Sequence, residues 1–201
     1  MSSIVLASGS PRRKQLLQWA EVDFEIIVRE TPETWPPELG VAEVPIHIAR
    51  NKAMAVAREI AGQDRIILAA DTVVVLEDEI IGKPSGREDA IDILSRLAGR
   101  RHDVITGVSL LRAGEETAFA DITKVWFHPL SRADIEGYVD RYKPYDKAGA
   151  YAIQEWIGVV GIARIEGDFY NVMGLPVSRV VQALRAWGAL PPGKTGAIAG
   201  R

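Results

Sequence analysis

Apolar segments with the length of strands alternate with helical segments through the first hundred residues of the chain. Residues 3–7 (SIVLA), 23–28 (DFEIIV) and 65–76 (RIILAADTVVVL) have the apolar, β-branched character of strands. Between the second and the third of them, residues 41–61 carry apolar side chains at helical spacing. This alternation predicts an α/β fold.

The second half of the chain adds antiparallel features to this pattern. Residues 102–112 and 117–128 are β-rich runs that flank the turn AGEE, and together they predict a hairpin. The other expected elements are helices at 87–99, 132–142 and 176–188 and a strand pair within 159–172. We therefore expect a mixed sheet in one domain over residues 1–188, followed by a poorly ordered tail over residues 189–201.

Composition excludes several classes of function. The 201 residues include 24 Lys and Arg against 27 Asp and Glu, and this net charge of -3 lacks the basic excess typical of proteins that bind nucleic acid or anionic membranes. The chain has no cysteine, which excludes disulfides and thiolate metal sites, and its three histidines do not favour a zinc site. We expect neither a nucleic acid nor a membrane partner.

The N-terminal segment also bears on location. Its charged residues follow a short apolar stretch, which is the reverse of a secretory signal. No uninterrupted apolar run approaches the roughly 20 residues that span a bilayer. We expect a cytoplasmic protein.

A polar turn between the first strand and the following helix has the features of an anion site. It contains Ser8, Arg12 and Arg13, with Pro11 where a first helical turn accepts proline. Backbone N–H groups at a helix start bind anions, and guanidinium groups add bidentate contacts. From this segment alone, a capped helix with solvated arginines is equally consistent.

Two acids and two lysines are further candidates. Asp71 interrupts an apolar strand, where a carboxylate is costly unless it meets a cation or backbone N–H groups. Lys83 lies in the tight turn GKP, whereas Lys52 on the long helix and Glu33 in a Pro-rich loop, taken by themselves, fit solvent exposure better than a site. Residues 146–154 (DKAGAYAIQ) form a small-residue loop in which Gln154 carries an amide that can read a base edge, although an ordinary strand entry explains the same residues.

Taken together, the spaced segments resemble the Maf family. The motifs are LASGSPRR at 6–13, ARNKA at 49–53, AADTVV at 69–74, GKP at 82–84, HDVITGV at 102–108, DKAGAYAIQ at 146–154 and GLP at 174–176. The resemblance runs in order from about residue 3 to residue 187. It implies an α/β fold like that of the inosine triphosphatases, with two lobes around a central mixed sheet flanked by helices and a cleft between the lobes.

The resemblance also implies an activity, the hydrolysis of a nucleoside triphosphate between its α and β phosphates. Asp71 matches the proposed general base, and Asp71 with Glu33 matches the positions that hold Mg²⁺ or Mn²⁺. The phosphate-handling positions of the family correspond here to Ser8, Arg13, Lys52 and Lys83. A homodimer is left open.

The residue types at three positions match the family branch that acts on dTTP and UTP: Arg12, Thr72 and Gln154. A related branch that acts on 7-methyl-GTP typically has an aromatic residue where Arg12 stands. Two other readings stay open, a nucleotide-binding regulator of cell division without catalysis and a pyrophosphatase for inosine triphosphate. His102 and Tyr151 are candidates for the pocket wall, and a structural role explains each of them equally well.

Overall fold

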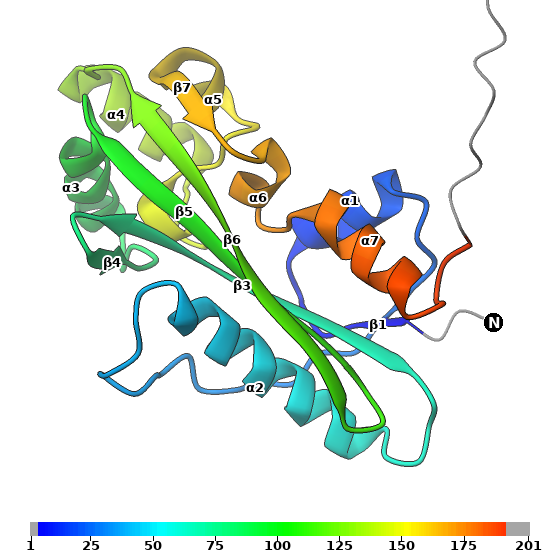
Figure 1. Ribbon diagram of the computed structural model, residues 1–201. Helices are drawn as coiled ribbons and strands as arrows, with labels where there is room; N and C mark the ends of the chain where they lie inside the picture. Colours follow the sequence, from blue (N-terminus) through cyan, green and yellow to red (C-terminus); the bar gives the residue numbers. More distant parts are fainter. Residues whose placement is uncertain (1–3, 192–201) are drawn as a thin grey trace, which may run out of the picture.

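A long, twisted sheet runs through the molecule, and helices cover both of its faces (Figure 1). The computed structural model describes residues 4–191. The sheet has the strand order β2-β1-β3-β5-β6-β7, and β4 pairs with β3 outside this path. The strands are β1 (Ile4–Leu6), β2 (Glu25–Ile26), β3 (Ile66–Leu76), β4 (Glu79–Ile81), β5 (Arg101–Arg112), β6 (Glu115–Phe127) and β7 (Ile162–Glu166).

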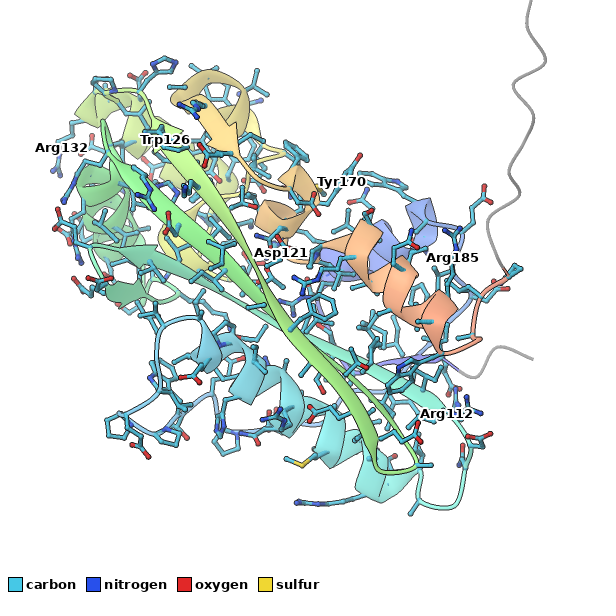
Figure 2. All side chains as sticks on the ribbon, viewed as in Figure 1. Arg112, Asp121, Trp126, Arg132, Tyr170 and Arg185 are labelled. Carbon is cyan, nitrogen blue, oxygen red and sulfur yellow. The ribbon has the colours of Figure 1, made fainter. Side chains whose placement is uncertain are left out.

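Both parallel and antiparallel pairs occur in the sheet, as the sequence predicts. Strand β1 pairs in parallel with β2 and with β3, whereas the pairs from β3 through β7 are antiparallel. The predicted hairpin is confirmed as β5 and β6. Arg112 and Trp126 mark its opposite ends in Figure 2, where the hairpin extends along most of the sheet. The mixed α/β sheet is therefore confirmed.

Seven α-helices and one 3₁₀ helix are present among residues 4–191. They are α1 (Pro11–Trp19), α2 (Glu43–Glu59), α3 (Arg87–Leu97), α4 (Arg132–Tyr142), η1 (Ala148–Ala150), α5 (Trp156–Gly161), α6 (Phe169–Met173) and α7 (Val177–Ala186). No helix in this described part of the chain is long and apolar enough to cross a membrane. The predicted tail lies outside the described residues from residue 192 onward.

The predicted strand pair within residues 159–172 is wrong. Only Ile162–Glu166 forms a strand, with α5 before it and α6 after it. The Asp168 side chain accepts a hydrogen bond from the Tyr170 backbone at 2.8 Å and caps α6. This cap, after Gly167 at a φ of 130°, turns the chain into a helix where apolar side chains alone had indicated a strand.

The two faces of β3 pack against different helices. Its odd-numbered apolar residues, such as Ala69 and Val73, share clusters with Ala49 and Ile48 of α2. Its even-numbered residues, such as Leu68, belong to the large cluster that also contains residues of α1, α3, α4 and α7. Since side chains alternate along a strand, each residue of β3 is directed to one helix layer or the other.

One edge of β3 is shared by two short strands. Strand β1 pairs with residues 66–68 and β4 pairs with residues 74–76, so β3 residues 69–73 lie between them along this edge. The chain leaves β1 here through residues 7–10 and enters α1. Ligands of α/β proteins bind at the carboxyl ends of parallel strands, and this gap is such a position.

Candidate active site

A cavity of about 690 Å³ opens at the gap beside β3. Segments from the N-terminal and the C-terminal parts of the chain line it. They include residues 7–13, 28–31, 71–72, 146–148, 151–152 and 172–174, together with Glu33, Lys52, Lys83 and Gln154. Every residue predicted to act in catalysis, in metal or phosphate binding or in recognition of the nucleobase therefore lines one cavity.

Lys52 joins the two predicted metal-site acids. Its Nζ donates to Asp71 Oδ1 at 2.7 Å and to Glu33 Oε1 at 2.8 Å. The side chains of Lys52 and Asp71 are 17% and 13% exposed, so this pair is largely shielded from water. The sequence left Lys52 open to a solvated position, but the alternation along β3 turns Asp71 toward α2 and explains the contact.

Glu33 has a second cation partner. Lys83 Nζ donates to Glu33 Oε2 at 3.0 Å, and both side chains are about half exposed. Burial raises the pKa of Glu33, but hydrogen bonds from Lys52 and Lys83 outweigh this effect and lower the pKa to about 2. The carboxyl group is therefore ionised at neutral pH.

Arg13 forms the opposite side of the site. Its residue is 9% exposed, and its guanidinium donates from Nε to Gly174 O at 2.8 Å and from Nη1 to Ser8 Oγ at 3.1 Å. Nη2 donates to Thr72 Oγ1 at 3.0 Å. Burial lowers the pKa of Arg13, an effect that the charge of Asp71 opposes. The guanidinium is held at three of its five N–H groups by residues of the described chain, and its orientation is defined.

Arg12 is held from across the cavity. Its Nη1 donates to Asp146 Oδ2 at 3.3 Å, and Asp146 also accepts from Lys147 Nζ at 2.7 Å. Burial raises the pKa of Asp146, but the hydrogen bond from Lys147 and the charges of Lys147 and Arg12 together lower the pKa by more, so the net shift is downward. An ionised Asp146 thus links the polar turn at residues 8–13 to the loop that carries Gln154.

The family model described as "Maf-like protein" matches residues 3–187. The chain belongs to the Maf family. A dTTP/UTP pyrophosphatase of Cytophaga hutchinsonii is 48% identical over 183 residues, covering 91% of this chain and 83% of the relative. A dTTP/UTP pyrophosphatase of Porphyromonas gingivalis is 46% identical, covering 92% of this chain and 94% of the relative.

A solved structure supports the fold assignment of this Maf protein. The Staphylococcus aureus Ham1 protein superposes with a TM-score of 0.51, at 17% sequence identity, covering 92% of this chain and 98% of that chain. At this identity the likeness concerns the fold alone. The expected α/β fold with a mixed central sheet is therefore confirmed.

The acids of this Maf protein fit a magnesium ion. Mg²⁺ binds through one or two carboxylates and substrate phosphates and retains several waters, and Asp71 and Glu33 supply two carboxyl groups for such a site. Within residues 4–191 no group of three or more His, Asp or Glu side chains is placed to hold a metal. Asp71 and Glu33, joined through one ammonium group, are the donor set that the fit requires.

The two candidates for the pocket wall separate in the structure. Tyr151 lines the cavity, whereas His102 lies behind it, 1% exposed, with its Nε2 2.7 Å from the Tyr151 hydroxyl. Burial lowers the pKa of His102 to about 3, so its ring is neutral at physiological pH. His102 is a support of the wall and does not itself line it.

The small residues of the 146–154 loop serve packing as well as the site. A Cβ on Gly149 would come within 2.8 Å of Val74 Cγ2, and its φ is 71°, so only glycine lets η1 lie this close to β3. Gly149 thus allows the close approach of this loop to the strand. Asp146 and the Gly174 carbonyl were given no role from the sequence, because a single motif does not indicate contacts with residues 134 or 161 positions away.

Proposed function

We propose that this Maf protein is a nucleoside triphosphate pyrophosphatase that hydrolyses dTTP and UTP to the nucleoside monophosphate and pyrophosphate. The observation that carries the proposal is the Lys52 ammonium, which joins Asp71 and Glu33 at the wall of a cavity that also holds Arg12, Arg13 and Lys83. A site for phosphate binding alone needs cations, whereas acids among phosphates repel them unless they hold a metal or act on water. The names of the relatives support the same activity.

In the proposed reaction, water attacks the α phosphorus and the bond from that phosphorus to the bridging oxygen breaks. Asp71 accepts the proton of the attacking water. Its Oδ1 already accepts from Lys52, so we assign Oδ2 to this proton transfer. Pyrophosphate leaves with the bridging oxygen, and the nucleoside monophosphate keeps the oxygen of the water.

The cations of the cavity have two tasks in this scheme. Arg13, Lys52 and Lys83 bind the triphosphate and offset the charge that builds up on pyrophosphate, and Ser8 with the start of α1 completes the phosphate cradle. Asp71 and Glu33 would hold Mg²⁺ or Mn²⁺, which supplies charge neutralisation at the phosphates when bound. Phosphoanhydride hydrolysis asks mainly for such positioning and neutralisation.

A second set of cavity residues is assigned to binding of the nucleobase. We propose that Arg12, Thr72 and Gln154 read a pyrimidine, with Arg12 fixed by its ion pair to Asp146. A polar site that pairs with one base leaves buried groups unmatched when another base enters, which discriminates more strongly than shape.

The test is a panel of nucleoside triphosphates with Mg²⁺, Mn²⁺ or EDTA, with products separated by anion exchange. We expect pyrophosphate and a monophosphate from dTTP and UTP, and loss of the reaction in EDTA. In water enriched in ¹⁸O, the label is expected in the monophosphate. Release of single phosphates, or label in pyrophosphate, would contradict the scheme. Binding without any hydrolysis would favour a nucleotide-binding regulator. A preference for 7-methyl-GTP or inosine triphosphate would overturn the assignment of a pyrimidine substrate.

A further inference from the structure

A series of hydrogen bonds runs from Arg13 through two threonine hydroxyl groups into the interior of the sheet. Thr72 on β3 lies directly opposite Thr106 on β5, and their Oγ1 atoms are 2.9 Å apart. Thr106 Oγ1 in turn donates to the backbone carbonyl of Asn171 at 3.2 Å. Thr72 lines the cavity, but Thr106 and Asn171 are each 0% exposed and do not.

The groups at the two ends of this series favour one direction for its hydrogen bonds, and Thr72 Oγ1 also lies 3.5 Å from the Gly174 carbonyl, a longer contact. A guanidinium can only donate, so Thr72 Oγ1 accepts from Arg13 and uses its own proton elsewhere. The carbonyl of Asn171 can only accept, so Thr106 donates to it and accepts from Thr72. All three bonds therefore point from the guanidinium toward α6, an arrangement in which each bond strengthens the next.

The end of the chain is itself fixed. Asn171 Nδ2 donates to Val104 O and to Thr123 Oγ1, each at 3.0 Å, which fastens α6 to β5 and β6. The same short segment supplies the Gly174 carbonyl that accepts from Arg13 Nε. Gly174 has a φ of 117°, a conformation that side chains rarely permit. Figure 2 labels Tyr170 on α6 and Asp121 on β6, two elements that the Asn171 side chain connects.

We propose that Thr106 and Asn171 are positioning residues that orient the Arg13 guanidinium toward the phosphates of the substrate. They act on Arg13 through Thr72 and through the Gly174 carbonyl, and they touch no substrate themselves. The inference rests on the proposed function in one respect, that Arg13 contacts the triphosphate. It gives Thr72 a role in addition to the reading of the base.

Packing alone does not explain why the polar residues Thr106 and Asn171 are buried. Valine at position 106 would fill the same volume on a strand, whereas each buried hydroxyl must find a partner or lose free energy. Asn171 Oδ1 is buried and has no hydrogen-bond partner within the described chain, a cost that an apolar residue would avoid. The series of hydrogen bonds ends at the Arg13 guanidinium in the cavity. Orientation of this cation accounts for the buried polar groups.

The experiment is a double-mutant cycle of Thr106→Val and Arg13→Met. For each protein we would measure kcat/KM for dTTP, the affinity for the α,β-methylene analogue by calorimetry, and the melting temperature. We expect Thr106→Val to lower kcat/KM by about tenfold or more in the wild-type background and by less than about twofold in the Arg13→Met background. Thr106→Ser, which keeps the hydroxyl, is expected to stay within about threefold of wild type.

The matched control is Ser109→Ala, which removes another buried hydroxyl of β5, one that donates to Glu116 away from Arg13. It is expected to leave kcat/KM within about twofold of wild type. Equal losses from Thr106→Val in both backgrounds, or a loss from Ser109→Ala as large as that from Thr106→Val, would overturn the inference. If Thr106→Val does not fold, Thr106→Ala serves in the same cycle.

A spectroscopic readout separates this inference from the proposed function. The Nε–H resonance of Arg13 is expected in the NMR spectrum of the wild type and of Thr106→Ser, and to broaden or exchange faster in Thr106→Val. An unchanged Arg13 resonance in Thr106→Val would overturn the inference even if dTTP is hydrolysed. Loss of this resonance in a protein that does not cleave dTTP would leave the positioning role standing and reject the activity.

Discussion

Asp71 and Thr72 are neighbours on β3, yet their side chains meet cations on opposite faces of the sheet. Asp71 Oδ1 accepts from Lys52 on α2 at 2.7 Å, and Thr72 Oγ1 accepts from Arg13 on α1 at 3.0 Å. The gap that β1 and β4 leave along the edge of β3 lets both residues line the same cavity. Two adjacent residues thus connect Lys52 and its carboxylate partners with Arg13 across β3.

The substitution Asp71→Asn is expected to lower kcat by at least about two orders of magnitude, because the amide cannot accept the proton of water. Nucleotide binding is expected to persist. The measurements are steady-state kinetics with dTTP and calorimetry with the α,β-methylene analogue. Asp64→Asn, which removes the exposed partner of Arg112 at the far end of the sheet, is the control. If Asp71→Asn keeps more than about half of the wild-type rate, another group acts as the general base.

Lys83→Ala is expected to raise KM for dTTP by about tenfold while the free energy of unfolding changes by less than about 1 kcal/mol. The reason is that Lys83 and Glu33 form an exposed ion pair, which contributes little to folding. Urea denaturation and kinetics measure the two effects. Lys124→Ala, which breaks a similarly exposed pair with Glu166, is expected to leave KM unchanged. Unchanged KM together with a large loss of stability in Lys83→Ala would assign Lys83 to structure instead.

Gln154→Ala is expected to reduce the preference for dTTP over GTP by about tenfold and to affect triphosphate affinity less. The amide lines the cavity beside the loop that Asp146 links to Arg12. Competition assays with pairs of nucleotides give the ratio of kcat/KM values directly. Gln154→Glu keeps the size of the side chain and tests whether the amide donors matter. An unaltered preference in both variants would remove Gln154 from the reading of the base.

His102 is expected to make the protein less stable as pH falls. Burial lowers its pKa in the folded state to about 3 from an ordinary 6.5, so between these values the unfolded chain binds more protons. The stabilisation is therefore complete above the unfolded pKa and is lost as pH falls from 6.5 toward 3. Urea denaturation at several pH values between about 7 and about 5 measures this.

His102→Gln is the variant for this measurement, and we expect it to flatten the dependence on pH. Tyr151→Phe removes the hydroxyl at Nε2 but keeps the ring buried, so it should retain the dependence. An equal loss of stability with pH in wild type and His102→Gln would assign the effect to other groups.

Much of the fold followed from local patterns of residues. The apolar run at 66–76 predicts β3, and the β-rich runs around AGEE predict β5 and β6, because strand length and turn residues are properties of short segments. The segment 159–172 shows the limit of this reasoning. Its apolar side chains suit strands as well as short buried helices, and the cap by Asp168 selected the helix α6.

The sequence by itself determined which residue types are present at the site and in which order along the chain. Asp71 was a candidate because an acid in an apolar strand needs a partner, and the SGSPRR turn because a helix start with arginines can bind an anion, whereas Lys52 and Lys83 received phosphate-binding roles through the resemblance to the Maf family. Their assembly in one cavity depends on strand pairing over long separations. Only the tertiary structure decided that Lys52 joins Asp71 to Glu33 and that Thr106 supports Arg13, because pairing register and face set these contacts.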